Sequence, residues 1–144
     1  TLKKISSKNI KVDGSLTWYY PYNDTNYGVL AHYKDNVNET KFCKFDDNFN
    51  IVKSWNFPQH IINEIKPWSI SGGFVKSGFV YASGHDKPVI YKFTINDNND
   101  ALTLFDTIDV VGSGQGIAFY NDDLLTINRN TSQVMKHLIR YDLE

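Results

Sequence analysis

The side chains of this sequence that are best suited to chemistry lie in two short glycine-containing motifs. In Gly84-His85-Asp86, a carboxylate next to an imidazole could orient it as a base or as a metal ligand. In Gly114-Gln115-Gly116, the Gln115 amide can both donate and accept hydrogen bonds. Simpler explanations compete with both, because a His-Asp pair can close a turn through backbone hydrogen bonds and a Gln side chain can bond a neighbouring strand.

Two further residues complete the candidate binding set. Trp68 combines a large apolar ring with one hydrogen-bond donor, so it could line a ligand site or pack between structural units. Arg129 begins a predicted turn over residues 129–132, and binding residues commonly lie on such connections. The candidate ligand-binding residues are therefore His85, Asp86, Gln115, Trp68 and Arg129.

No complete catalytic signature accompanies these residues. The sequence has no Gly-x-Ser-x-Gly elbow, phosphate-cradling loop, calcium loop or His-Glu-x-x-His motif. The other histidines, His32, His60 and His137, do not have zinc-site spacing, so we expect no metal site. Two function classes remain: a non-enzymatic binding module, or a hydrolase, lyase or cyclotransferase that uses His85 as base and Asp86 to orient it.

Charge and composition exclude several other classes. Fifteen basic and sixteen acidic residues give a net charge of −1, whereas a nucleic-acid-binding protein needs a concentrated cationic surface. No apolar run approaches the roughly 18–20 residues that span a bilayer, so we expect no membrane span. Cys43 is the single cysteine, so no disulfide can form within the chain, and a buried, unreactive thiol is the expected state.

Three sequons offer candidate glycosylation sites, at Asn23, Asn38 and Asn130. They favour a secreted or extracytoplasmic location only slightly, because a composition rich in Asn, Ser and Thr produces such motifs by chance. The chain begins at Thr1 rather than Met, which favours a processed product or a fragment.

Short aromatic and β-branched runs separated by polar turns predict an antiparallel meander in three rounds within one all-β domain, residues 1–144. The rounds cover residues 13–57, 68–110 and 115–141. Four strands are predicted in each of the first two rounds and three in the last. Residues 58–67 have helical spacing between two prolines and predict a connection with one helical turn.

A repeat of about 40–50 residues that holds four short strands is typical of β-propeller blades. Trp18, Ile70 and Ile117 align in this repeat, so we predict about three blades, with a β-sandwich or barrel as the alternative. Because known propellers have about four to eight blades, the chain would be a partial propeller or half of a dimeric ring, completed by a protein partner or a second copy. A strand near Ile10 is predicted to fill the vacant outer position of the third round or, in a fragment, to finish the preceding blade.

The chain also resembles a known group of proteins. Its Gly84-His85-Asp86 and Gly114-Gln115-Gly116-Ile-Ala motifs are similar to those of bacterial-type β-propeller proteins with a repeated Gly-His-Asp and Gly-Gln-Gly-Ile-Ala pattern. More distantly, the Gln-Gly pair resembles that of glutamine cyclotransferase-like propellers. The match covers about residues 68–130 and implies a propeller fold, but no catalytic residue carries over.

Propeller geometry makes a specific prediction about the candidate residues. In each blade, the connection into the first strand and the connection between the second and third strands lie on one face. Residues 59–67, 84–86, 112–115 and 129–132 should therefore share a face. Motifs that are far apart in the sequence are thus predicted to lie together.

Overall fold

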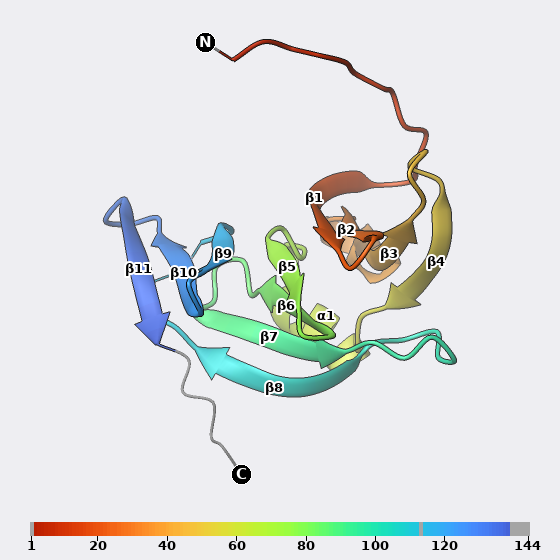
Figure 1. Cartoon of the computed structure of the whole chain (residues 1–144). Helices are drawn as coiled ribbons and strands as arrows, with labels where there is room; N and C mark the ends of the chain where they lie inside the picture. The colour runs from red at the N-terminus through yellow and green to blue at the C-terminus, as the bar shows by residue number, and fades with distance from the viewer. Residues whose placement is uncertain (1, 113, 139–144) are drawn as a thin grey trace.

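The computed structural model describes residues 2–112 and 114–138, which form three antiparallel sheets (Figure 1). The first sheet contains β1 (Ser15–Tyr22), β2 (Thr25–Ala31), β3 (Lys41–Phe45) and β4 (Ile51–Asn56). The second contains β5 (Gly73–Lys76), β6 (Phe79–Ser83), β7 (Val89–Thr94) and β8 (Thr103–Asp109). The third contains β9 (Ile117–Tyr120), β10 (Asp123–Asn128) and β11 (Gln133–Leu138). The predicted all-β fold is confirmed.

Each sheet is a meander, because strands that are consecutive in the chain pair with each other. One sheet falls within each predicted round, 13–57, 68–110 and 115–141, although residues 139–141 lie outside the described part of the chain. No sheet in the described part closes on itself as a barrel would.

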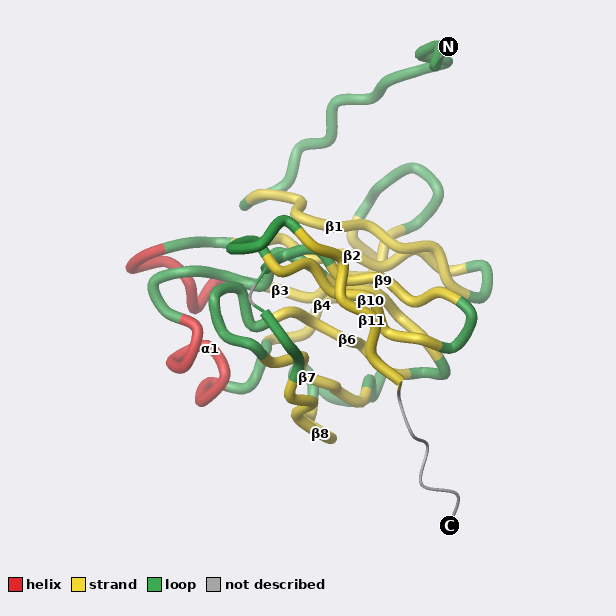
Figure 2. The backbone as a smooth tube through the Cα atoms, turned by 90° about the vertical axis from the view of Figure 1, so that its left-hand side faces the viewer, coloured by secondary structure: helices red, strands yellow, loops and turns green. Residues whose placement is uncertain are grey.

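The sheets follow one another along an arc, with their first strands on the inner side (Figure 1). Strand β1 contacts β5, and β5 contacts β9. Strands β4 and β8 lie on the outer side of their sheets. The two short helices, η1 (Lys34–Glu39) and α1 (Gln59–Ile65), both lie on one side of the stacked sheets (Figure 2).

The hairpin between the first and second strands has the same turn in all three sheets. Its two central residues are Asn23–Asp24, Ser77–Gly78 and Asn121–Asp122, and all six have positive φ, between 47° and 77°. A two-residue turn with positive φ at both positions matches the right-handed twist of the strands and favours Asn, Asp and Gly. The three sheets are therefore copies of one local design.

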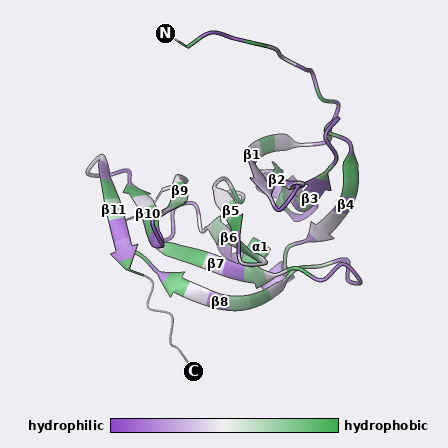
Figure 3. Ribbon diagram, in the orientation of Figure 1, coloured by the Kyte–Doolittle hydropathy of each residue, from purple (hydrophilic) through white to green (hydrophobic). Residues whose placement is uncertain are grey.

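The core lies between neighbouring sheets. Figure 3 shows the hydrophobic stretches along the ribbons of the strands. Val29, Phe42 and Trp55 of the first sheet pack against the second sheet and against the apolar side of α1. A smaller cluster that includes Phe74 and Leu124 joins the second and third sheets. Burial of these aromatic and aliphatic side chains is the main force that holds the sheets together.

Gly72 and Gly73 allow the three sheets to approach one another closely. A Cβ atom on Gly73 would lie 2.4 Å from the indole of Trp18 in the first sheet. A Cβ atom on Gly72 would lie 1.6 Å from the carbonyl oxygen of Gln115, which leads into the third sheet. Only residues without a side chain fit at this junction.

The predicted strand near Ile10 is not present, which corrects the expectation that it completes the third sheet. Residues 2–12 form no strand. They leave the molecule beside the first sheet, at the opposite end of the arc from β11, and their far end extends away from the sheets (Figure 1). Residues 8–12 run beside the turn between β3 and β4, where Lys8 donates a hydrogen bond to the Asn48 carbonyl. No neighbouring strand is available there to satisfy the hydrogen bonds of a ladder.

Several element boundaries also differ from the sequence prediction. Strand β1 continues through Pro21, which an edge strand tolerates because its outward N–H position needs no partner. Strand β5 begins at Gly73 rather than at Trp68, so Trp68 lies in the segment that leads into the strand. The η1 helix was not predicted, whereas the turn of helix expected in 58–67 is present as α1.

Cys43 should resist thiol reagents as long as the protein is folded. Its side chain is fully buried in β3, and burial raises the pKa of the thiol from 9.0 to about 11. The thiolate is the reactive form, so labelling by a chromogenic disulfide reagent at pH 8 should be slow and should follow unfolding in a urea titration. The folded state has the higher pKa, so any stability that this thiol contributes is retained below pH 9 and decreases as the pH rises towards 11. Rapid labelling in the absence of urea would contradict the buried position.

Candidate functional site

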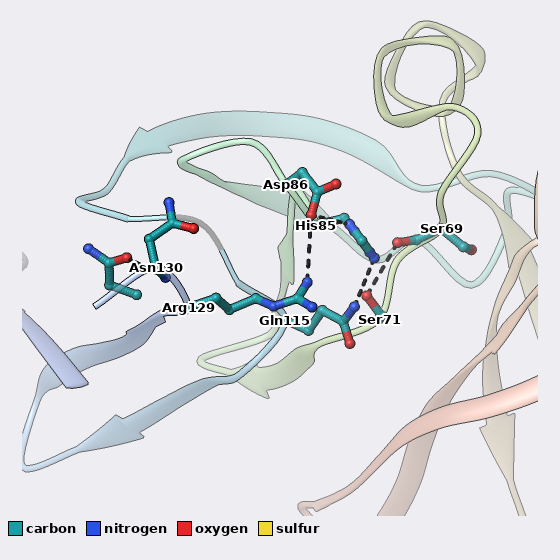
Figure 4. Close-up of polar contacts among 8 residues, drawn as sticks. Ser69, Ser71, His85, Asp86, Gln115, Arg129 and Asn130 are labelled. Atoms are coloured by element: carbon teal, nitrogen blue, oxygen red, sulfur yellow. Dashed lines mark hydrogen bonds and ion pairs between the residues drawn. The ribbon is translucent and has the colours of Figure 1, made fainter. Parts of the chain in front are cut away.

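A depression at the junction of the second and third sheets contains all five candidate residues. Its volume is about 590 Å³. The lining residues are Trp68, His85, Asp86, Gln115, Arg129 and Asn130. Figure 4 shows all of these except Trp68. They come from the segments that lead into β5 and β9 and from the β6–β7 and β10–β11 turns. These are the connections that the sequence predicts to share a face.

His85 is the most buried member of the group. Only 5% of its surface is exposed, and its φ of 57° places it in the left-handed region. The turn is held by a backbone hydrogen bond from Lys87 N to Gly84 O of 3.1 Å and one from Gly84 N to Val89 O of 3.0 Å. Non-glycine residues seldom adopt this conformation, so the fixed turn directs the imidazole towards the third sheet.

Trp68 stacks on the imidazole. The two rings are nearly parallel, at 4°, with centroids 4.9 Å apart. The indole nevertheless remains 45% exposed. Part of a large apolar ring, held in position by its neighbour, is thus available to a bound molecule.

The contacts of His85 define the state of its ring. Gln115 Nε2 lies 2.8 Å from His85 Nε2, and because an amide nitrogen can only donate, the ring nitrogen accepts. In the tautomer that suits this bond, the ring proton is on Nδ1, which lies 2.8 Å from Asp86 Oδ1. This second contact is not a hydrogen bond, so it is mainly electrostatic.

Asp86 makes a second contact between the His85 turn and the third sheet. Its Oδ1 lies 3.6 Å from Arg129 Nη1. The resulting chain of contacts, from Gln115 to His85, Asp86 and Arg129, crosses twice between the second and third sheets. Both charged side chains are about half exposed, at 55% and 54%, so solvent screens their attraction and the contact positions the groups more than it stabilises the fold.

Helix α1 and the segment before β5 hold the His85 turn in position. Lys87 donates a hydrogen bond of 3.0 Å to Glu64 of α1, and this bond lowers the pKa of the Glu64 carboxyl. At the other end of the turn, Ser83 N donates to Gly72 O over 2.9 Å. The turn is thus attached both to the helix and to the glycine junction.

Two contributors to the site were not recognised in the sequence. Asn130 lines the depression, but the sequence identified it only as a sequon and as part of the predicted turn over residues 129–132. Gly72 sets the distance between Gln115 and the second sheet, although nothing in its local sequence indicates a contact with residue 115. The sequon residues Asn23, Asn38 and Asn130 are all exposed. Their glycosylation stays a prediction, and a glycan at Asn130 would cover the site.

Within residues 2–112 and 114–138, no three His, Cys, Asp or Glu side chains are placed to hold a metal ion. The same part of the chain has no helix with the length and apolar character needed to cross a membrane. In comparisons with known proteins, no protein-family model matches the chain, and no curated protein matches it.

The geometry distinguishes between His85 as a general base and His85 as part of a binding site. A general base needs a free ring nitrogen within reach of the substrate proton. Asp86 does face Nδ1, as the enzyme hypothesis requires, but Nε2 is already occupied by Gln115. Catalysis by His85 would require that this bond be broken first, whereas binding uses the arrangement as it stands.

Proposed function

We propose that this chain is a β-propeller segment that binds a small polar ligand at the depression between its second and third sheets. The observation that carries the proposal is the grouping of Trp68, His85, Asp86, Gln115, Arg129 and Asn130 from four separate connections around one depression. Ligand sites typically combine apolar surface with a few converging polar groups.

The architecture supports the propeller part of this proposal. Three meanders with the same first hairpin turn follow one another along an arc, and their first strands contact one another on its inner side. Radial repetition of four-stranded sheets about a central axis is the definition of a propeller. The missing part of the ring is supplied by another chain or another copy.

The side chains also restrict the ligand. The exposed part of the Trp68 indole offers an apolar surface for a flat or ring-shaped group. Among residues 2–112 and 114–138, Arg129 makes one ion pair, of 3.6 Å with Asp86, and its guanidinium carries five donor hydrogens in all. The Asn130 amide can both donate and accept. The formal charges of Arg129 and Asp86 cancel. A neutral or zwitterionic molecule with one apolar face and several hydrogen-bonding groups fits this site best.

Ligand binding can be tested by NMR on ¹⁵N-labelled protein. We expect that a member of a panel of neutral sugars, amino acids and nucleosides shifts the Trp68 indole signal, which the Trp68→Phe variant identifies by its absence. The Trp55 indole is fully buried, so its signal should not move. Failure of every compound in the panel to move the Trp68 signal would contradict the proposed site.

Alanine at Trp68 or Arg129 should weaken binding of the identified ligand by about 5- to 30-fold, since an aromatic stacking contact or a charge-assisted hydrogen bond contributes about 1–2 kcal/mol. Phe105→Ala is a suitable control, because Phe105 is an exposed aromatic residue that does not line the depression. Calorimetric titration of the three variants makes the comparison. Equal losses in all three would indicate a general effect on folding.

A further inference from the structure

Two segments of the chain that are 98 residues apart share a pattern that extends beyond the general repeat. Residues 10–24 and 108–122 are identical at seven of fifteen positions. The matching pairs are Ile10 and Ile108, Val12 and Val110, Gly14 and Gly112, Ser15 and Ser113, Tyr22 and Tyr120, Asn23 and Asn121, and Asp24 and Asp122.

Backbone geometry follows the same correspondence. Gly14 and Gly112 both have positive φ, at 105° and 85°. Asn23 and Asp24, at 48° and 57°, match Asn121 and Asp122, at 47° and 63°. At these glycine and turn positions, the two segments therefore share backbone conformation as well as sequence.

This correspondence assigns a role to the amino-terminal arm, residues 5–11. They match residues 103–109, which form β8, the outer strand of the second sheet. In the single chain, however, the arm pairs with no strand, and Ile5 is 98% exposed. The arm thus matches an outer strand in sequence, but it belongs to no sheet in the single chain.

The third sheet, in contrast, lacks a fourth, outer strand among the described residues. The described residues give it three strands, and β11 forms its free outer edge. Its face away from the second sheet is apolar, with a groove of about 310 Å³ that includes Ala118, Leu125 and Ile127. Val134 and Leu138 are 68% and 78% exposed. A monomeric protein seldom leaves an apolar sheet face and an unpaired edge open together.

The matching positions of the first sheet indicate what this face of the third sheet contacts. By the same offset, Ala118, Leu125 and Ile127 match Tyr20, Tyr27 and Val29. These three residues of the first sheet pack into the core between the first and second sheets. The exposed face of the third sheet thus corresponds to a face that another sheet covers within this chain.

The first sheet also carries the complementary surface. On its side away from the second sheet, Leu30, Cys43 and Phe45 form an apolar cluster with Leu16 and Val12 against it. Val12 matches Val110, which packs between the second and third sheets. This cluster is therefore one half of a contact between two sheets.

We propose that two copies of this chain assemble head to tail, with the first sheet of each copy on the third sheet of the other, and that residues 5–11 of each copy form the fourth strand beside the partner's β11. The arrangement gives the arm a sheet, gives the third sheet an outer strand and covers its apolar face. Two such contacts close a ring of six sheets, within the range known for propellers. The inference rests on the propeller part of the proposed function and not on the ligand.

The pairing register can be predicted. Strand β7 pairs with β8 so that Ile90 lies opposite Ile108. Val134 occupies the position in the third sheet that Ile90 occupies in the second, counted from the matched hairpin turns. Since Ile10 matches Ile108, Ile10 of one copy should lie opposite Val134 of the other.

Oligomeric state provides the first test. Light scattering after size-exclusion chromatography should give twice the chain mass of 16.6 kDa. Deletion of residues 1–11, and separately Val134→Asp, should each raise the dissociation constant at least tenfold. Phe105→Asp, at an exposed aromatic position of the second sheet, should leave the dimer intact. A wild-type monomer with the β-sheet circular dichroism of a folded protein would overturn the inference.

Cross-linking provides the second test and does not depend on the stability of the variants. In a Cys43→Ala background, Ile10→Cys with Val134→Cys should form a disulfide-linked dimer on mild oxidation. Ile10→Cys with Leu138→Cys, four residues out of register on the same strand, should form far less. Equal cross-linking of both pairs would reject the predicted pairing. NMR binding at Trp68 is measured independently, so failure of the dimer and failure of the ligand site are distinguishable.

Discussion

Alanine at Trp55 should lower the free energy of unfolding by about 3–5 kcal/mol, which is a large fraction of the total stability of a domain of this size. Trp55 in β4 is fully buried between the first and second sheets, and its ring lies 5.5 Å from that of Phe42. Its indole nitrogen also donates a hydrogen bond of 2.9 Å to the Asn96 carbonyl, in the connection between β7 and β8. The substitution removes this bond and leaves a cavity that a β-sheet core refills poorly.

Urea denaturation followed by far-ultraviolet circular dichroism measures this loss. Trp55→Phe should cost less, because it keeps most of the apolar contact and removes the hydrogen bond to Asn96. Trp68→Ala is the matched control, since Trp68 is 45% exposed and should cost about 1 kcal/mol or less. Similar losses at positions 55 and 68 would show that the core does not lie between the first two sheets.

Alanine at Gly72 should both destabilise the protein and disrupt the candidate site. A Cβ atom at this position would lie 1.6 Å from the Gln115 carbonyl oxygen, which is part of the backbone and cannot rotate away. The segment leading into β9 must therefore move, and an overpacked junction of this kind costs about 3 kcal/mol. The movement also withdraws the Gln115 amide from His85.

Gly78→Ala is the control for this substitution. No atom lies within 4 Å of a Cβ at Gly78, so the change adds only the cost of a positive φ of 77°, about 1–2 kcal/mol. Urea titration gives the stabilities, and the chemical shift of the Gln115 side-chain amide shows whether the bond to His85 persists. An unchanged amide signal in Gly72→Ala would mean that the two sheets do not meet at this glycine.

The candidate residues could be selected from the sequence because their types are unusual where they occur. A His-Asp pair after a strand, a Gln between two glycines and a Trp before a β-run are each recognisable locally. Their proximity followed from the connectivity of repeated four-stranded units, which fixes the side on which each connection lies. Asn130 was missed as a lining residue because an Asn in a turn is ordinarily explained by turn chemistry.

The contacts between these residues could not be predicted. Nothing in the sequence shows that Gln115 occupies Nε2 of His85, because that bond depends on the distance between two sheets. The course of residues 2–12 was also mispredicted, since a strand needs a neighbouring strand and local propensity does not supply one.

By itself, the sequence determined the all-β class, the positions of most strands and the three-fold repetition, because alternating apolar residues and turns with Asn, Asp and Gly act over a few neighbouring positions. Only the tertiary structure decided which of those residues form a site. Three contacts define the site: the stacking of Trp68 on His85, the hydrogen bond of Gln115 to Nε2 of His85, and the close approach of Gln115 to Gly72. All three arise where separate segments or sheets meet. Contacts of this kind depend on packing distances between distant segments, which no local pattern encodes.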